Sequence, residues 1–71
     1  MKMATLQTKD PKAHARNIQQ MLTDVIEHVR KDADLVDEPK AQALFETTAE
    51  VLVGLRTAHE HYASGAENAM R

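Results

Sequence analysis

Apolar residues recur at steps of three and four over two long stretches of the chain. In the first stretch these positions are Ala15, Ile18, Met21, Leu22, Val25, Ile26 and Val29. Such spacing places the apolar side chains on one face of a helix with about 3.6 residues per turn. Asp10 and Pro11 stand before this stretch, and this order is typical of a helix N-cap followed by proline in the first turn. We therefore predict a helix over residues 10–32.

The second apolar repeat is wider than the first. Its main seam comprises Ala41, Phe45, Thr48, Leu52, Leu55, His59 and Tyr62, with Leu44, Val51 and Ala58 on a parallel line. The alternating steps of four and three resemble a coiled-coil seam. We expect Asp37 to cap this helix and Gly65 to end it, because glycine readily adopts the left-handed conformation. The pattern predicts a helix over residues 38–63 and a turn over the polar segment 33–37.

These elements predict an all-α fold, a two-helix antiparallel hairpin over residues 10–65. Residues 1–9 are expected to form a flexible N-terminal arm and residues 66–71 a C-terminal tail. The chain has 71 residues, of which 3% are aromatic, and it has no cysteine. It is therefore too small to enclose a large core by itself, and no disulfide compensates for this. We predict that two hairpins assemble as a homodimeric four-helix bundle, which would cover the wide face of the second helix.

Six residues of the second helix are the predicted dimer interface. They are Leu44, Thr47, Val51, Gly54, Leu55 and Ala58. A glycine inside a helix costs about 1 kcal/mol relative to alanine, and close approach of another helix is one reason for Gly54. The alternative is that Gly54 is tolerated on a partly exposed side. We expect Ala49 and Val53 to face outward as a further small apolar patch.

Charge placement is more informative than the formal net charge of −2. Lys9, Lys12 and Arg16 gather near the first helix start, and residues 32–38 contain four acidic side chains. A head-to-tail dimer would bring these opposite charges together, although exposed pairs contribute only about 0–1 kcal/mol each. The slightly negative total argues against broad nucleic-acid binding, so an RNA- or DNA-binding dimer using the basic arm is a secondary hypothesis.

The histidines suggest a metal-binding bundle as the main alternative function. An antiparallel hairpin would gather His14, His59, His61 and Glu60 at its open end, and His and carboxylate groups bind zinc, nickel or iron. However, His59 and His61 point in different directions, and neither helix has the Glu-x-x-His spacing of di-iron bundles. Asp24 and His28 stand four residues apart, a spacing that allows them to chelate a metal ion or, more commonly, to form a surface hydrogen bond.

The sequence shows no constellation of catalytic residues, no phosphate-binding glycine loop and no apolar run of about 18 residues. We therefore predict a non-enzymatic, cytoplasmic interaction module without a cofactor and without a membrane span. A protein partner beyond the second copy is also compatible with this prediction.

The segment Asp37–Tyr62, DEPKAQALFETTAEVLVGLRTAHEHY, resembles short uncharacterised bacterial helical-hairpin proteins. ALFETTAEVL followed by Gly54 and Leu55 is the most specific part of the resemblance. It covers the second helix and its cap, and it implies no activity or site residues.

Overall fold

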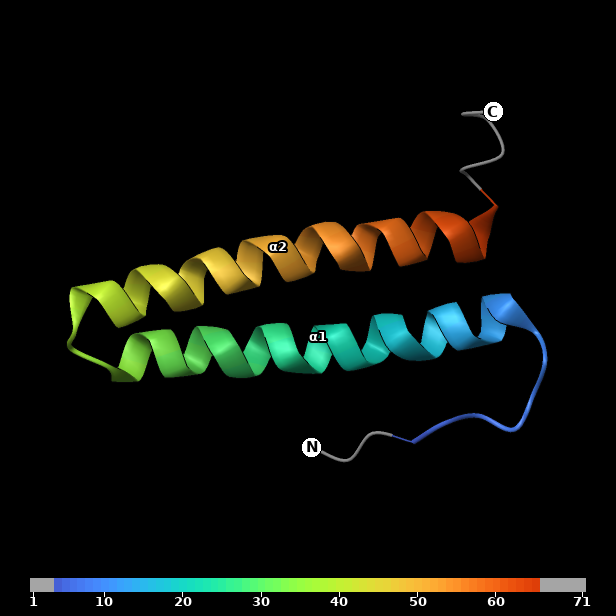
Figure 1. Cartoon of the computed structure of the whole chain (residues 1–71), viewed down its shortest axis with the longest axis horizontal. Helices are drawn as coiled ribbons and strands as arrows, with labels where there is room; N and C mark the ends of the chain where they lie inside the picture. The colour runs from blue at the N-terminus through green and yellow to red at the C-terminus, as the bar shows by residue number, and fades with distance from the viewer. Residues whose placement is uncertain (1–3, 66–71) are drawn as a thin grey trace.

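Two antiparallel helices form the hairpin in the computed structural model, which describes residues 4–65. Helix α1 spans Pro11–Leu35 and helix α2 spans Pro39–Ser64, and residues 36–38 join them. The helices lie side by side, so that the start of α1 and the end of α2 meet at an open end opposite the turn (Figure 1). The described residues contain no strand. The predicted all-α hairpin is therefore confirmed, while residues 1–3 of the arm and the tail 66–71 lie outside the described residues.

The outer ends of both helices follow the local sequence signals. The Asp10 side chain accepts a hydrogen bond of 3.0 Å from the backbone N–H of Lys12, as an N-cap residue does. Gly65 has a φ of 80° and its N–H donates to carbonyls in the last turn of α2. This left-handed glycine satisfies orphan carbonyl groups at the helix end. The predicted start of α1 and stop of α2 are therefore both confirmed.

The turn is shorter than predicted, and its cap is different. Helix α1 continues to Leu35 because its buried face extends to Ala33, which is buried against α2. The prediction that Asp37 caps α2 is wrong, since the N-cap residue is Glu38 and its side chain makes no capping bond. Instead, the Gln42 side chain donates a 2.8 Å hydrogen bond to the carbonyl of Val36. A side chain of α2 therefore anchors the segment that joins the two helices.

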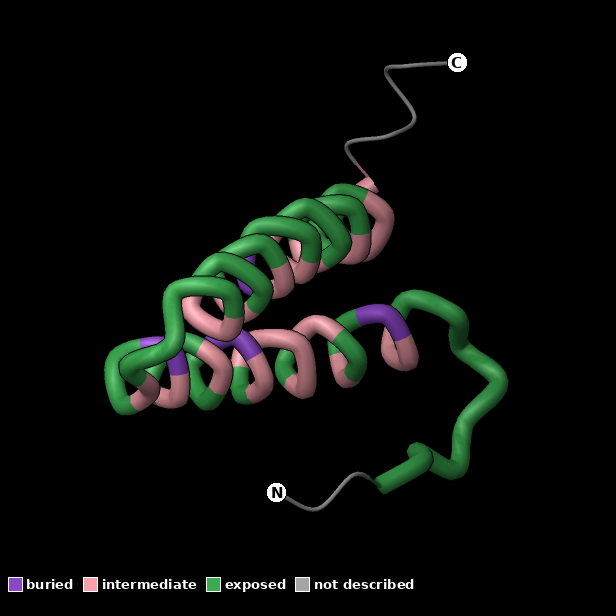
Figure 2. The backbone as a smooth tube through the Cα atoms, turned by 60° about the vertical axis from the view of Figure 1, so that its left-hand side comes forward, coloured by how far each residue is buried: buried purple, intermediate pink, exposed green. Residues whose placement is uncertain are grey.

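The core of one hairpin is very thin. The buried apolar residues in the described part of the chain are Ala15, Ile26, Ala33 and Ala49. Ile26 is 1% exposed and is the only large side chain there that is fully buried. The buried segments lie where the two helices face each other (Figure 2). Because alanine buries little apolar surface, the three buried alanines add little hydrophobic stabilisation to that of Ile26.

The face that α2 presents to α1 is rotated from the predicted seam. Ala49 is only 3% exposed and Val53 is half-buried, so the prediction that both face outward is wrong. Leu55, which was expected in the seam, keeps 47% of its surface exposed. The predicted seam assumed a repeat of about 3.5 residues per turn, whereas a straight helix has about 3.6 and drifts about 20° per heptad from that repeat. The other predicted seam residues are partly buried, and Ala49 lies beside Ala33 of α1.

Candidate interaction surface

Helix α2 carries a ridge of large apolar side chains that no other part of the hairpin covers. We define the α2 ridge as Leu44, Val51 and Leu55, which are 62%, 58% and 47% exposed. Their spacing of seven and four residues places them on one face of the helix. Large contiguous apolar surfaces of this kind are candidates for interaction with another protein.

Small side chains border the α2 ridge. Thr47, Gly54 and Ala58 are exposed, as are the three ridge residues, so all six predicted interface residues lie at the surface of one hairpin. A Cβ atom added at Gly54 would meet nothing within 4 Å. Nothing within a single hairpin therefore requires glycine at this position.

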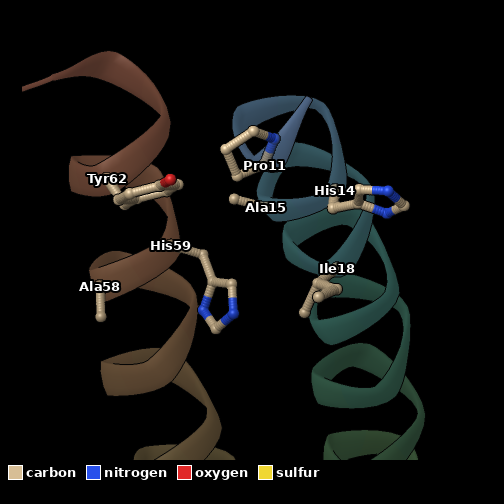
Figure 3. A pocket seen from close by; sticks show the side chains of 7 residues that line it. All are labelled: Pro11, His14, Ala15, Ile18, Ala58, His59 and Tyr62. Atoms are coloured by element: carbon tan, nitrogen blue, oxygen red, sulfur yellow. The ribbon is translucent and has the colours of Figure 1, made fainter. Parts of the chain in front are cut away.

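An apolar groove adjoins this surface at the open end of the hairpin (Figure 3). From α1 it is lined by Pro11, His14, Ala15 and Ile18. From α2 it is lined by Ala58, His59 and Tyr62. The groove has a volume of about 370 Å³, and its walls are almost entirely apolar. Since Ala58 belongs both to the groove and to the predicted interface, the two features form one continuous surface.

The opposite side of the hairpin is polar. The Gln19 side chain donates to Glu60 at 3.5 Å, and Arg56 donates to the hydroxyl of Thr23 at 3.3 Å, each bond joining α1 to α2. Successive helical residues are about 100° apart, which separates Leu55 on the ridge from Arg56 on the polar side. The hairpin is therefore two-sided, with apolar and polar surfaces on different sides of the helix pair.

The sequence interpretation missed these cross-helix hydrogen bonds. Thr23 has Gln19, Gln20 and Glu27 among its neighbours one turn away, so its surroundings in the sequence do not mark it as part of a contact between the helices. The pairing itself depends on how the two helices are aligned along each other. The sequence alone does not give this alignment, so it does not predict a hydrogen bond between Thr23 and Arg56.

The structure does not bring the predicted metal ligands together. His14 Nε2 donates to the carbonyl of Thr8 at 2.7 Å, and its ring points away from α2, whereas the His59 ring lies between the helices (Figure 3). Glu60 lies on the polar side with Gln19, and His61 is exposed. Within residues 4–65, no three His, Cys, Asp or Glu side chains are close enough to hold a metal ion. Consecutive residues of α2 point in different directions, so His59, Glu60 and His61 do not converge.

The Asp24–His28 pair is also not formed. Asp24 accepts a 3.2 Å hydrogen bond from Gln20, while His28 lies 3.2 Å from the carboxylate of Asp32, one turn further along. The His28 and Asp32 side chains are 73% and 44% exposed, so their pairing adds little to stability.

Part of the predicted N-terminal arm lies along α1. The Asn17 side chain donates to the carbonyl of Ala4 at 3.0 Å, and His14 donates to that of Thr8. These bonds hold residues 4–9 beside the first turns of α1, while Lys9, Lys12 and Arg16 remain exposed. Flexibility of this arm stays a prediction.

Neither helix in the described part of the chain combines the length and the apolar character needed to cross a membrane. Comparisons with protein-family models, curated proteins and solved structures gave no match to the chain. The resemblance of Asp37–Tyr62 to bacterial hairpin proteins therefore stays a prediction. Any functional proposal depends on the chain's own surface, of which the α2 ridge and the adjoining groove are the most distinctive parts.

Proposed function

We propose that this protein is a small interaction module that pairs with a second copy of itself through the α2 ridge. Two hairpins would then form a homodimeric four-helix bundle with a structural rather than a catalytic role. The observation that carries the proposal is the contrast between a thin core and an exposed apolar ridge on the same hairpin.

The distribution of large apolar side chains supports this pairing. Among the described residues, six large apolar side chains are exposed, including the three of the α2 ridge, whereas Ile26 alone is fully buried. A stable domain of this size normally buries most of its large apolar side chains or relies on oligomerisation. A second hairpin on the ridge would move these side chains from water into a core.

The character of the groove favours a structural role. Catalytic sites combine a concave pocket with several convergent polar groups. The groove at the open end instead has almost entirely apolar walls. A surface of this kind suits the side chains of another helix better than it suits acid–base chemistry.

A charged substitution on the ridge tests the proposal. Val51→Lys would place an ammonium group in the middle of the dimer contact, where burial without a partner is strongly unfavourable. We expect this variant to be a monomer by light scattering under conditions where the unmodified chain has twice the monomer mass of 7.9 kDa. Thr57→Lys is the matched control, because Thr57 is exposed on the same helix but away from the ridge. Equal masses for the two variants would contradict the proposal.

A further inference from the structure

Large and small side chains on the exposed face of α2 occupy opposite positions about Val51. Leu44 lies seven residues before Val51, and Ala58 lies seven residues after it. Leu55 lies four residues after Val51, and Thr47 lies four before it. Each large side chain on one side of Val51 is therefore matched by a smaller one at the same distance on the other side.

The two residues three positions from Val51 also follow this pattern, with the larger side chain before Val51 and the smaller one after it. Thr48 lies three residues before Val51 and Gly54 three residues after it. The Thr48 hydroxyl donates to the carbonyl of Leu44 at 2.8 Å, so its hydrogen bond is made within α2 and its methyl group is available for an apolar contact. Nothing lies within 4 Å of a Cβ atom built at Gly54, so this position leaves room for the close approach of a second helix.

From this order we infer that two copies pair with their α2 helices antiparallel and crossing at Val51. The inference rests on the proposed function and specifies the orientation of the pair. In this arrangement a residue before Val51 faces the residue equally far after Val51 in the other copy. Leu44 then faces Ala58 of the partner subunit, and Leu55 faces Thr47 of the partner subunit. Alternation of large and small side chains across facing positions is how close-packed helix interfaces avoid both gaps and clashes.

The groove at the open end gives Leu44 a place to pack. Ala58 lines the groove together with Ile18 and Tyr62, and its side chain is a single methyl group (Figure 3). A leucine facing Ala58 would enter a nearly apolar space of about 370 Å³. Each hairpin thus carries both an exposed leucine and a groove to receive one, which satisfies the self-complementarity of a two-fold dimer.

The parallel arrangement is less favourable for packing. Each residue would then face its own copy, so that Leu44 and Leu55 would each meet a leucine, whereas Gly54 would meet a glycine. Two large side chains at one level hold the helices apart, and two small ones at the next level leave a gap. The observed order of side chains avoids this only when the helices are antiparallel.

Charge favours the same orientation. A parallel pair would place both turns together, and each turn region carries Asp34, Asp37 and Glu38 at the surface. An antiparallel pair brings each turn region toward the end of the partner where the exposed Lys12 and Arg16 lie. Such exposed charges contribute only about 0–1 kcal/mol per pair, so they add to an orientation that packing selects.

Disulfide trapping distinguishes the two orientations, because the chain has no cysteine of its own. In the antiparallel pair two copies of Leu44 are separated by about 21 Å along the helices, given about 1.5 Å per residue, whereas a disulfide needs Cα atoms within about 7 Å. We therefore expect Leu44→Cys alone not to form a linked dimer under mild oxidation. A mixture of Leu44→Cys and Ala58→Cys chains should form the mixed dimer, and Val51→Cys should link to itself.

The possible outcomes separate this inference from the proposed function. If light scattering shows a dimer but Leu44→Cys links to itself, the antiparallel orientation is overturned and the proposed function stands. If the chain is a dimer and Val51→Cys does not link, the crossing point at Val51 is overturned. If the chain is a monomer, the proposed function fails and the orientation fails with it.

A substitution that fills the groove side of the contact provides a second test without cysteine chemistry. Ala58→Trp would occupy the space that receives Leu44, and we expect it to weaken the dimer at least tenfold. Ala43→Trp is the control, because Ala43 is also an exposed alanine of α2 but lies off the ridge. An equal effect of the two tryptophans on the dissociation constant would overturn the packing of Leu44 against Ala58.

Discussion

Leu44→Ala measures how much of the α2 ridge is buried between two copies. The change removes three methylene-sized groups, each worth about 0.8 kcal/mol when transferred from water to an apolar environment. Leu44 keeps 62% of its surface exposed in one hairpin, and a dimer that buries this surface would gain about 1.5 kcal/mol from each leucine. Two copies give about 3 kcal/mol, so we expect the dissociation constant of the dimer to rise about 100-fold.

Sedimentation equilibrium over a range of concentrations measures this change directly. Leu35→Ala is the matched control, since Leu35 is 80% exposed at the end of α1 and does not belong to the ridge. Substitutions at such surface positions usually change free energies by less than about 0.5 kcal/mol, or a factor of about two. An unchanged dissociation constant for Leu44→Ala, or an equal loss for Leu35→Ala, would refute the reasoning.

Three further predictions concern individual residues. Gly54→Ala should raise the helicity of the monomer measured by circular dichroism, because alanine favours a helix by about 1 kcal/mol. The same change should weaken the dimer, and an unchanged dissociation constant would contradict a close approach of the two helices at Gly54. Asp10→Ala should lower the free energy of unfolding by about 0.5–2 kcal/mol in a urea titration, because it removes the N-cap bond to Lys12. Ile26→Ala should lower it by about 2–5 kcal/mol, since Ile26 is the only fully buried large side chain among residues 4–65; a smaller loss than for Ile18→Ala would be inconsistent with the core described above.

Features encoded by neighbouring residues were predictable from the sequence. Asp10 followed by Pro11 sets the start of α1 through a hydrogen bond two residues away. Gly65 ends α2 because its own φ is positive. The antiparallel hairpin follows from two amphipathic stretches joined by a short polar segment. None of these features depends on contacts between distant parts of the chain.

Features that depend on the rotation and alignment of the helices were not predictable. Ala33 and Ala49 contribute little to an apolar pattern, yet both are buried at the helix contact. Helix α1 accordingly continues past the predicted turn to Leu35, and the helix contact includes Ala49 rather than Leu55. The rotation of α2 places Glu60 on the polar side and His59 between the helices, which separates the predicted metal ligands. The six residues predicted as the dimer interface are all exposed in a single hairpin, and their burial between two copies stays a prediction.

The central claim is that a single hairpin is incomplete and pairs with a second copy through the α2 ridge. Light scattering coupled to size exclusion at micromolar concentration, with and without a chelator, tests it most directly. The account predicts a particle of twice the monomer mass of 7.9 kDa, unchanged by the chelator. A folded monomer would contradict the claim, and a dimer that dissociates on chelation would show that a metal ion, rather than the ridge, holds the copies together.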